Sequence, residues 1–454
     1  MTMRLFEHIC AGLLLLPATF LWSQVDNTTG NVGADSNDSR MLTPPPVSGQ
    51  SYPTLATSEE RANYLRGGLA FTTAYTDNAL GSVIGHPVSD VSYSVAPFIS
   101  LDETTSRLHF ALTYAPGFTF YQRLSSRNEQ DQNASIDLQY RLSPHVTFSA
   151  RDGFQKGSNV FNRPDLALAT AVSGGVQEPN FSVIAPIADR LSNSGNAGIT
   201  YQFAANGMVG ASGTFTNLHY PNQPEVPGLF DSSSQGGSVF YAHRVSKMHY
   251  IGVTYQYQRL IAYPTIGHSE TRTHAPLFFY TLYATSRFSI SFFGGPQHSD
   301  TIEPRLAALQ LQLPPARAWT PAAGASMSWQ GRLTNLAVSY SHLISGGGGL
   351  IGAVHMDSAT ASIRQQMTRN LSGSLAGAYT QNNLLASALG AGLNGHTISA
   401  TASLQRQFLQ HINLELGYTR LHQSYSSVAV LAATPNTSRE FVSISYQFSR
   451  PLGR

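Results

Sequence analysis

The chain has 454 residues, a formal net charge of +2 and only 11% charged residues. So small a net charge excludes recognition of nucleic acid or of a strongly acidic partner by bulk electrostatics. A soluble domain usually carries about 25% charged residues, so the composition also disfavours an ordinary water-soluble protein. Disorder of most of the chain is excluded as well, because 42% of the residues are hydrophobic, with 23 Phe and 21 Tyr among them.

The N-terminal residues have the layout of a secretory signal peptide. Arg4 precedes an apolar run from Ile9 to Leu21, and the small Ser23 offers a cleavage site. The run is shorter than the ~20 apolar residues that a transmembrane helix needs. Cys10 is the single cysteine and lies inside the run, so the sequence predicts neither a lipid anchor nor a disulfide in the mature chain. We therefore expect residues 1–23 to be a signal peptide.

A second segment, residues 24–62, is rich in Asn, Asp, Ser and Gly and contains the triplet Pro44-Pro45-Pro46. Such a composition cannot bury enough apolar surface to fold, so we expect a disordered periplasmic linker here. The remaining residues, 63–454, are expected to form the folded part of the chain.

Apolar and polar residues alternate through most of that folded part, in about 18 segments near the 9–11 residues that a tilted membrane strand needs. A two-residue period puts one kind of side chain on each face of a strand. In one such segment the apolar and polar sets are Ala134, Ile136, Leu138 and Tyr140 against Ser135, Asp137, Gln139 and Arg141. We expect the first set to face lipid and the second set to face a lumen.

Short and long connections alternate along the chain between these segments. Short links are expected near residues 101–105, 142–145, 204–207, 245–247, 284–287, 330–332, 368–370 and 408–411. Long loops rich in Gly, Ser, Asn and Pro are expected near residues 77–88, 122–130, 157–193, 218–236, 262–270, 297–319, 345–356, 382–395 and 423–438. This order is typical of an all-β, antiparallel up-and-down transmembrane β-barrel with short periplasmic turns and long extracellular loops. We expect about 18 strands, with 16 as the alternative count.

A soluble sandwich, propeller or solenoid would also show alternation. Its polar face would meet water and would be expected to carry many Lys and Glu residues. Here the polar positions hold mainly Ser, Thr, Gly, Asn and Gln. The sequence therefore favours residues 63–454 as a barrel in the cell outer membrane, with outer-membrane lipid as its surroundings.

The last alternating segment ends in Ser445-Tyr446-Gln447-Phe448. This ending resembles the aromatic-ended last strand of bacterial outer-membrane β-barrel proteins of the porin-like kind, and the resemblance in pattern extends over about residues 65–450. It implies that the barrel-assembly machinery recognises the strand from Val442 to Phe448. The chain departs from the family pattern because it continues beyond Phe448 to Arg454.

The resemblance implies a channel for passive diffusion of small hydrophilic solutes, since a barrel of this strand number is wide enough to hold water. The third long loop, residues 157–193, resembles in position and length the external loop that narrows general porins. We expect it to be a constriction loop, with a lid or a loop packed on its neighbours as the alternative. Its candidate residues are Phe161, Arg163, Asp165, Glu178, Asp189 and Arg190.

Charged side chains in the lumen would set the selectivity of such a channel. The pore-lining candidates are Arg107, His109, Asp137, Arg141, Arg151, Arg364 and Glu415. Arginines outnumber acids in this set, and rings of Arg favour anions. We expect a weak preference for anions; pairing of Arg with carboxylates across the wall is the alternative.

No motif predicts an enzyme, a catalytic residue, a metal site or a cofactor. Gly346 to Gly349 are expected to be a flexible loop, because no helix follows them to form a phosphate cradle. A structural or adhesive barrel with an occluded lumen that displays surface loops remains the alternative function. The pattern leaves the choice between a monomer and a homo-oligomer open.

Overall fold

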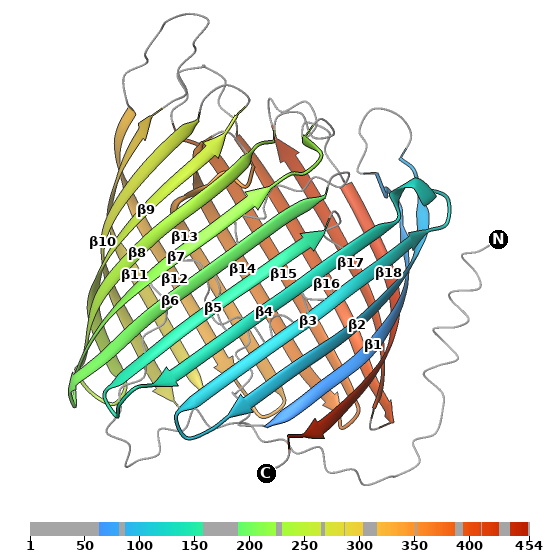
Figure 1. The fold of residues 1–454 in the computed structure, drawn as a ribbon, viewed down its shortest axis with the longest axis horizontal. Coiled ribbons are helices and arrows are strands. Elements are labelled where there is room, and N and C mark those ends of the chain that lie inside the picture. The colour runs from blue at the N-terminus through green and yellow to red at the C-terminus, as the bar shows by residue number, and fades with distance from the viewer. Residues whose placement is uncertain are drawn as a thin grey trace, which may run out of the picture.

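Eighteen strands form one closed sheet in the computed structural model of the chain (Figure 1). The structure describes residues 63–80, 87–157, 189–223, 229–264, 268–285, 287–302, 316–349, 352–385, 394–409, 411–425 and 436–452. The expected signal peptide, residues 1–23, and the expected linker, residues 24–62, lie outside the described residues. The first strand begins at Tyr64.

The strands follow one another around the barrel in the order of the sequence. The first nine are β1 Tyr64–Thr76, β2 Asp90–Thr104, β3 Leu108–Tyr121, β4 Glu129–Arg141, β5 Val146–Gly157, β6 Arg190–Ala204, β7 Gly207–His219, β8 Asp231–Arg244 and β9 His249–Tyr263. The second nine are β10 Ser269–Thr285, β11 Phe288–Ile302, β12 Ala316–Gln330, β13 Thr334–Gly346, β14 Ala353–Thr368, β15 Leu371–Leu384, β16 Asn394–Leu409, β17 Ile412–Tyr425 and β18 Asn436–Pro451.

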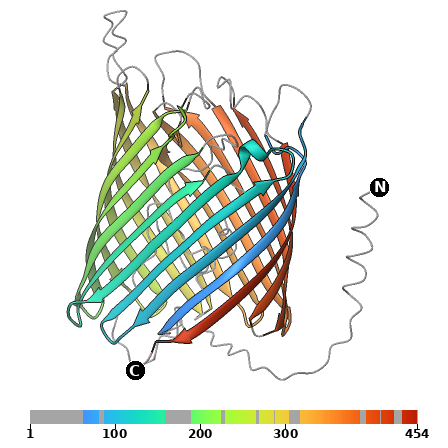
Figure 2. The same cartoon turned by 45° about the vertical axis from the view of Figure 1, so that its right-hand side comes forward.

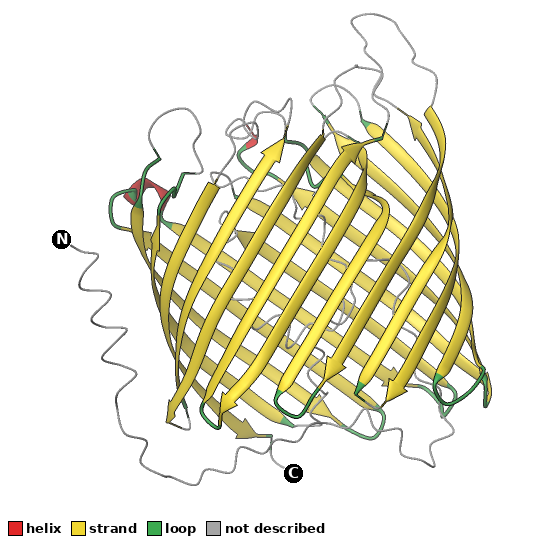
Figure 3. Cartoon of the chain, turned by 180° about the vertical axis from the view of Figure 1, so that it is seen from behind, coloured by secondary structure: helices red, strands yellow, loops and turns green. Residues whose placement is uncertain are grey.

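Each strand pairs antiparallel with its neighbour in sequence, and the barrel closes where β1 pairs with β18, from Tyr64 opposite Pro451 to Thr76 opposite Arg439 (Figure 2). The prediction of an up-and-down all-β barrel is confirmed, and the strand count is 18, not 16. Strands make up nearly the whole wall (Figure 3). The helix with described bounds is the short 3-10 turn Ser125–Arg127.

Short turns join the strands at one end of the barrel and longer loops join them at the other end (Figure 1). Hydroxyl side chains close several of the short turns. The Thr105 Oγ1 atom accepts a hydrogen bond from the Leu108 N–H (3.0 Å), and the Ser143 Oγ atom accepts one from the Val146 N–H (3.1 Å). Such local bonds give Ser and Thr their preference for turns, and they explain why links as short as these reverse the chain.

The outer face of the barrel carries an apolar belt between aromatic girdles. Exposed residues occupy alternate positions on adjacent strands, as in the direct pair of Leu112 on β3 and Ile136 on β4. Exposed tyrosines lie on this face, toward the end with the short turns at Tyr140, Tyr201 and Tyr446 and near mid-strand at Tyr340, Tyr379 and Tyr418. A closed barrel with this exterior satisfies all backbone polar groups inside lipid and is the architecture of outer-membrane proteins. The described residues therefore form a barrel of the outer-membrane type.

No helix among the described residues is long and apolar enough to cross a membrane.

Candidate functional site: the inner wall of the barrel

The inner wall is defined by the register of the strands. Ile136 is exposed on the outer face, so its neighbour Asp137 points into the barrel. Asp137 lies directly opposite Ala111 on β3 and Arg151 on β5. Residues that face each other across neighbouring strands share one face of the sheet, so all three belong to the inner wall.

An ion pair joins the first two charged candidates on this wall. The Arg151 Nε atom lies 2.7 Å from the Asp137 Oδ2 atom, and both side chains are partly buried. A pair this close cancels most of its own field at a distance from it. These two residues therefore add hydrated polar groups to the wall but little net charge.

Further candidates follow on both sides of the seam between β1 and β18. An Arg364 Nη2 group donates to the Gln405 Oε1 atom (3.4 Å), and Glu415 lies directly opposite Gln405. The His109 Nδ1 atom lies 3.0 Å from the Thr104 Oγ1 atom. Arg141 donates through Nη1 to the Ser106 carbonyl oxygen (3.5 Å), at the end of the barrel with the short turns.

Arg107 differs from the other pore-lining candidates because it lies in the turn between β2 and β3, not on a strand. Its carbonyl oxygen accepts a hydrogen bond from the Arg141 N–H (2.7 Å). The alternation that assigned it to the wall ends at Thr104 and resumes at Leu108. Arg107 is thus a residue of the periplasmic rim.

Most of the expected constriction loop lies outside the described residues, including Phe161, Arg163, Asp165 and Glu178. Its last two candidates are described. The Asp189 Oδ2 atom lies 3.7 Å from the Lys156 Nζ atom, and Arg190 begins β6 opposite Gly157. Both residues stand at the extracellular end of the wall formed by β5 and β6.

A different segment enters the barrel among the described residues: the tip of the β13–β14 hairpin, which we define as residues 343–349 and 352–354. The pairing of β13 with β12 ends at His342 opposite Ala323, while β13 and β14 stay paired as far as Gly346 opposite Ala353. Beyond His342, β13 therefore leaves β12, while β14 stays paired with β15 as far as Val354 opposite Leu384.

Three hydrogen bonds tie the hairpin tip to the inside of the wall between β7 and β11. The Tyr220 hydroxyl donates to the Gly348 carbonyl oxygen (3.1 Å), and the Phe230 N–H donates to the Gly349 carbonyl oxygen (2.7 Å). On β11, the Gln297 Oε1 atom accepts from the Ile344 N–H (3.1 Å). Because these are main-chain groups of the hairpin, the contact depends on its backbone path.

Glycines allow that backbone path. Gly348, Gly349 and Gly352 have φ angles of 63°, 105° and 86°, which lie in the left-handed region that side chains disfavour. A Cβ atom on Gly349 would also lie 2.7 Å from the Tyr220 Oη atom. The run Gly346–Gly349 thus fits closely against the wall, where the sequence predicted a flexible loop.

Apolar side chains hold the hairpin from both of its sides. Leu343 and Met356 face each other across the hairpin and pack with the inward-facing apolar cluster of β7 to β12. That cluster consists of Met208, Ala242, Tyr250, Ala275, Leu277, Phe279, Phe293 and Ala322, besides Leu343. Ile344 packs with Leu260, Ala353 and Leu385 in a second cluster. One sector of the barrel therefore has an apolar inner core like that of a soluble domain.

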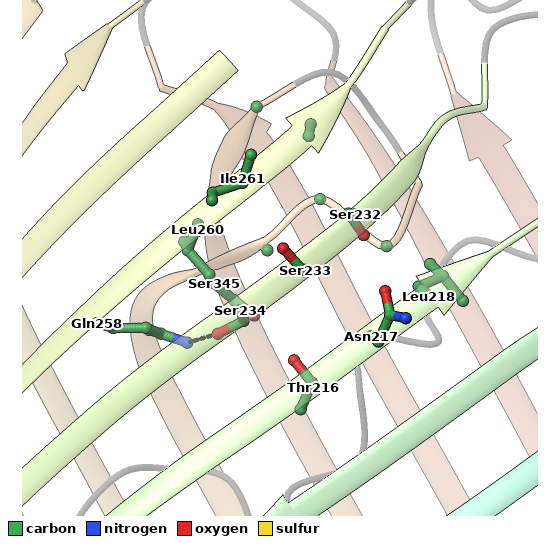
Figure 4. A pocket seen from close by; sticks show the side chains of 15 residues that line it. Thr216, Asn217, Leu218, Ser232, Ser233, Ser234, Gln258, Leu260, Ile261 and Ser345 are labelled. Carbon is green, nitrogen blue, oxygen red and sulfur yellow. Dashed lines mark hydrogen bonds between the residues drawn. The ribbon is translucent and has the colours of Figure 1, made fainter. Parts of the chain in front are cut away.

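A small polar cavity remains between the hairpin tip and the wall (Figure 4). Ser345 lines it from the hairpin, and Thr216, Ser234 and Gln258 line it from β7, β8 and β9, with Gln258 donating to the Ser234 Oγ atom (2.9 Å). Its volume of about 40 Å³ has space for a few water molecules. The cavity is too small to hold a transported solute, so it belongs to the packing of the hairpin.

Among the described residues, no three His, Cys, Asp or Glu side chains gather closely enough to hold a metal ion.

No protein-family model matches the chain, and no curated protein matches it. Solved structures share its barrel fold at low similarity. OccAB4 of Acinetobacter baumannii is 9% identical, with 87% of this chain and 100% of that chain covered and a TM-score of 0.38. OccK2 (OpdF) of Pseudomonas aeruginosa is 9% identical (86% and 98% covered, TM-score 0.40), and the FrpB iron transporter of Neisseria meningitidis is 7% identical (85% and 82% covered, TM-score 0.40). At such low similarity, these structures do not indicate which solutes pass through the barrel.

Proposed function

We propose that the chain is an outer-membrane channel for passive diffusion of small hydrophilic solutes, narrowed at its extracellular end by the β13–β14 hairpin tip. The observation that carries the proposal is the division of the inner wall into two unlike sectors. The hairpin tip and the apolar cluster occupy the sector from β7 to β13. Among the described residues, the opposite sector, from β14 through β18 to β6, presents a polar inner surface.

Paired hydroxyl groups line that polar sector. They form hydrogen bonds between neighbouring strands on the inner face: Thr72–Ser443, Ser94–Thr119, Ser100–Thr113, Ser374–Ser403 and Thr401–Thr419. A hydroxyl that is already paired still accepts from water, because its oxygen has two lone pairs. A wall of this kind wets readily and holds no solute tightly, as conduction requires.

A weak preference for anions is part of the proposal. The Asp137–Arg151 pair contributes little net charge, whereas Arg141 and Arg364 donate to the uncharged oxygens of Ser106 and Gln405. Glu415 offsets part of the Arg364 charge, so the preference rests chiefly on Arg141. We therefore propose an excess of positive potential along the polar sector.

Single-channel recording of the refolded protein in a planar bilayer tests the proposal. We expect stable conductance steps, and under a salt gradient a reversal potential displaced slightly toward that of the anion. Silence from protein that has folded and inserted would refute the channel. Steps with a cation-selective reversal potential would refute only the anion preference.

The second candidate function is a structural or adhesive barrel with an occluded lumen. The inward hairpin and the apolar cluster favour it to some degree, because both occupy space that an open pore would leave to water. The same recording separates the two functions, since an occluded barrel does not conduct while its hairpin is docked.

A further inference from the structure

The outer face of the barrel carries a group of arginines just beyond the extracellular aromatic girdle, on strands β9 to β12. Arg259, Arg272, Asp300 and Arg317 lie directly opposite one another on these four strands, and we call them the arginine row. The row is on the outer face because Tyr255 and Trp319, which are exposed there, stand an even number of residues from Arg259 and Arg317 on the same strands. The inner wall and the channel therefore play no part in it.

An aromatic row lies next to the arginine row, on the side of the membrane centre. Tyr257, His274, His298 and Trp319 face one another across the same four strands. The rings of Tyr257 and His274 are 5.1 Å apart between centroids, and those of His298 and Trp319 are 4.8 Å apart. Aromatic side chains of this kind mark the boundary between acyl chains and headgroups.

The spacing of the two rows matches the layering of a lipid leaflet. Two residues along a strand tilted by about 45° rise by roughly 5 Å along the membrane normal. The guanidinium groups therefore stand just outside the aromatic boundary, at the level of lipid phosphates and no longer among the acyl chains. Arginine is well suited to that level because its planar fork pairs with phosphate oxygens.

Two acidic residues on the same outer face pair with these arginines. Glu270 accepts hydrogen bonds from Arg259 (2.8 and 3.0 Å) and from Arg272 (2.7 Å), and its side chain is only 6% exposed. The side chains of Arg259 and Arg272 are 38% and 48% exposed. On β12, Arg317 is 68% exposed and lies 3.6 Å from Asp300. The surface that lipid meets is therefore cationic, while the main carboxylate is covered.

We propose that the arginine row binds the phosphate group of an anionic lipid in the outer leaflet, whose acyl chains lie against the aromatic row. Three arginines lie beside two acidic residues here. The buried Glu270 carboxylate holds two of the guanidinium groups side by side. Elsewhere on the outer face, Arg420 stands beside Tyr418 without a second arginine opposite it on β16 or β18. The row is thus a site for one phosphorylated lipid, distinct from the general attraction of a membrane surface.

Trp319 provides a direct probe, because it stands in the aromatic row and is 69% exposed to lipid. The full chain with Trp22 and Trp329 changed to Phe is refolded into phosphatidylcholine vesicles that contain a small share of phosphatidic acid brominated on its acyl chains. Bromine quenches tryptophan only on close approach. Brominated phosphatidylcholine at the same share gives the reference for a lipid without the extra charge.

We expect brominated phosphatidic acid to quench Trp319 as if it were enriched about fivefold around the site, and the enrichment to shrink in 1 M salt, where screening shortens to about 3 Å. The variant Arg259→Gln/Arg272→Gln/Arg317→Gln loses the enrichment. The control Arg420→Gln keeps it. A second control retains Trp329 in place of Trp319, near the other end of β12, and shows no enrichment.

Equal quenching by the two brominated lipids, or an enrichment that survives the triple variant, would overturn the proposal. If inorganic phosphate at millimolar concentration restores the Trp319 fluorescence, the row recognises the lipid through its phosphate group. Retarded or accelerated mobility of unheated protein on gels reports whether each variant is folded. If the triple variant does not fold, the single variant Arg272→Gln and the salt dependence of the parent protein decide the matter.

Discussion

At the scale of single residues, the inner wall carries charged side chains that pair with each other, so their net charge is small. Asp137 and Arg151 face each other on β4 and β5 at 2.7 Å, so a residue that the sequence marks as acidic offers solutes little negative field. Partly exposed pairs of this kind contribute about 0–1 kcal/mol to stability. The pair matters more for the potential along the channel than for the fold.

Asp137→Asn should make the channel more selective for anions, because it leaves the charge of Arg151 without its partner carboxylate. We expect the reversal potential under a salt gradient to move toward that of the anion, with little change in the temperature at which the barrel unfolds. The double variant Asp137→Asn/Arg151→Gln serves as the matched control and should return toward the parent value. An unchanged reversal potential in Asp137→Asn would place the pair off the ion path.

Tyr220 governs the fit of the hairpin tip from the loop after β7. Burial raises the pKa of its phenol, and the nearby charge of Asp231 raises it further. The folded-state pKa lies above the ordinary value of 10.0, so the stabilisation by the protonated donor is fully present below pH 10 and declines only above it. The hydrogen bond to Gly348 is therefore expected to persist throughout the physiological range.

Tyr220→Phe removes that donor and leaves the buried Gly348 carbonyl unpaired, at a cost of about 1–3 kcal/mol. We expect the hairpin to leave its docked position at least about fivefold more often, seen as additional current flicker in single-channel records. The flicker of the parent protein should not change between about pH 6 and pH 9. Tyr263→Phe is the control, because its hydroxyl contacts Ser233 at 3.2 Å on the exposed outer face. Equal flicker in both variants would argue against a hairpin gate.

At the scale of elements, the β13–β14 hairpin is built unlike the other hairpins at its end of the barrel. Its β13 strand loses its pairing with β12 after His342, while Leu343 and Ile344 are buried and Met356 is partly buried in the interior. Burial of a large aliphatic side chain contributes about 1.5–3 kcal/mol. The lost ladder of β12 is thus offset by apolar packing, and the hairpin tip acts as a fixed partition of the lumen.

Gly349→Ala should displace that partition. The substitution requires φ of +105° for a residue with a side chain, and its Cβ atom would lie 2.7 Å from the Tyr220 hydroxyl. We expect a higher single-channel conductance and faster uptake of larger uncharged sugars in a vesicle-swelling assay. Gly346→Ala is the matched control, because its Cβ atom would lie at an ordinary 3.7 Å from Leu260. A conductance that is the same in both variants would mean that the hairpin tip does not limit the pore.

At the scale of the whole molecule, the barrel depends on the seam between its first and last strands. These strands are separated by the rest of the chain, so their pairing carries the largest loop-closure cost of any strand pair. The Phe448 ring covers Gly67 across the seam, so closely that a Cβ atom on Gly67 would lie 2.6 Å from it. Aromatic cover of a glycine on the neighbouring strand fixes register, and here it does so at the position that closes the barrel.

Phe448→Ala should therefore slow barrel formation more than a similar loss elsewhere. Phe408→Ala is the matched control, since both rings are 42% exposed on the outer face and Phe408 belongs to β16, away from the seam. We expect the folded band of unheated protein to form several-fold more slowly in Phe448→Ala during refolding into detergent. In cells, recognition of Val442 to Phe448 by the assembly machinery, which stays a proposal, predicts a loss of inserted protein for the same variant. Identical refolding of the two variants would assign Phe448 no role in closure.

Much of the wall could be predicted because a strand in a membrane barrel has only two faces. Ile136 and Asp137 were assigned to opposite sides from their neighbours alone. Each expected link falls between two strands, although several strands extend into it, as β11 and β12 do at residues 297–302 and 316–319. The prediction placed Arg107 on the wall wrongly, because a turn interrupts the two-residue period there. The predicted constriction loop lies mainly outside the described residues. The hairpin tip was missed because a run of glycines has no side chains to reveal which surface it meets.

The sequence by itself determined the compositional class, the period of two, the side of the sheet on which each side chain lies and the order of short and long links, since these depend on neighbours within a few residues. Only the tertiary structure decided which distant residues meet. The docking of Gly348 on Tyr220 and the gathering of Arg259, Arg272 and Arg317 depend on strand register and on the curvature of a closed sheet. Those quantities come from many strands at once, and no single segment contains them.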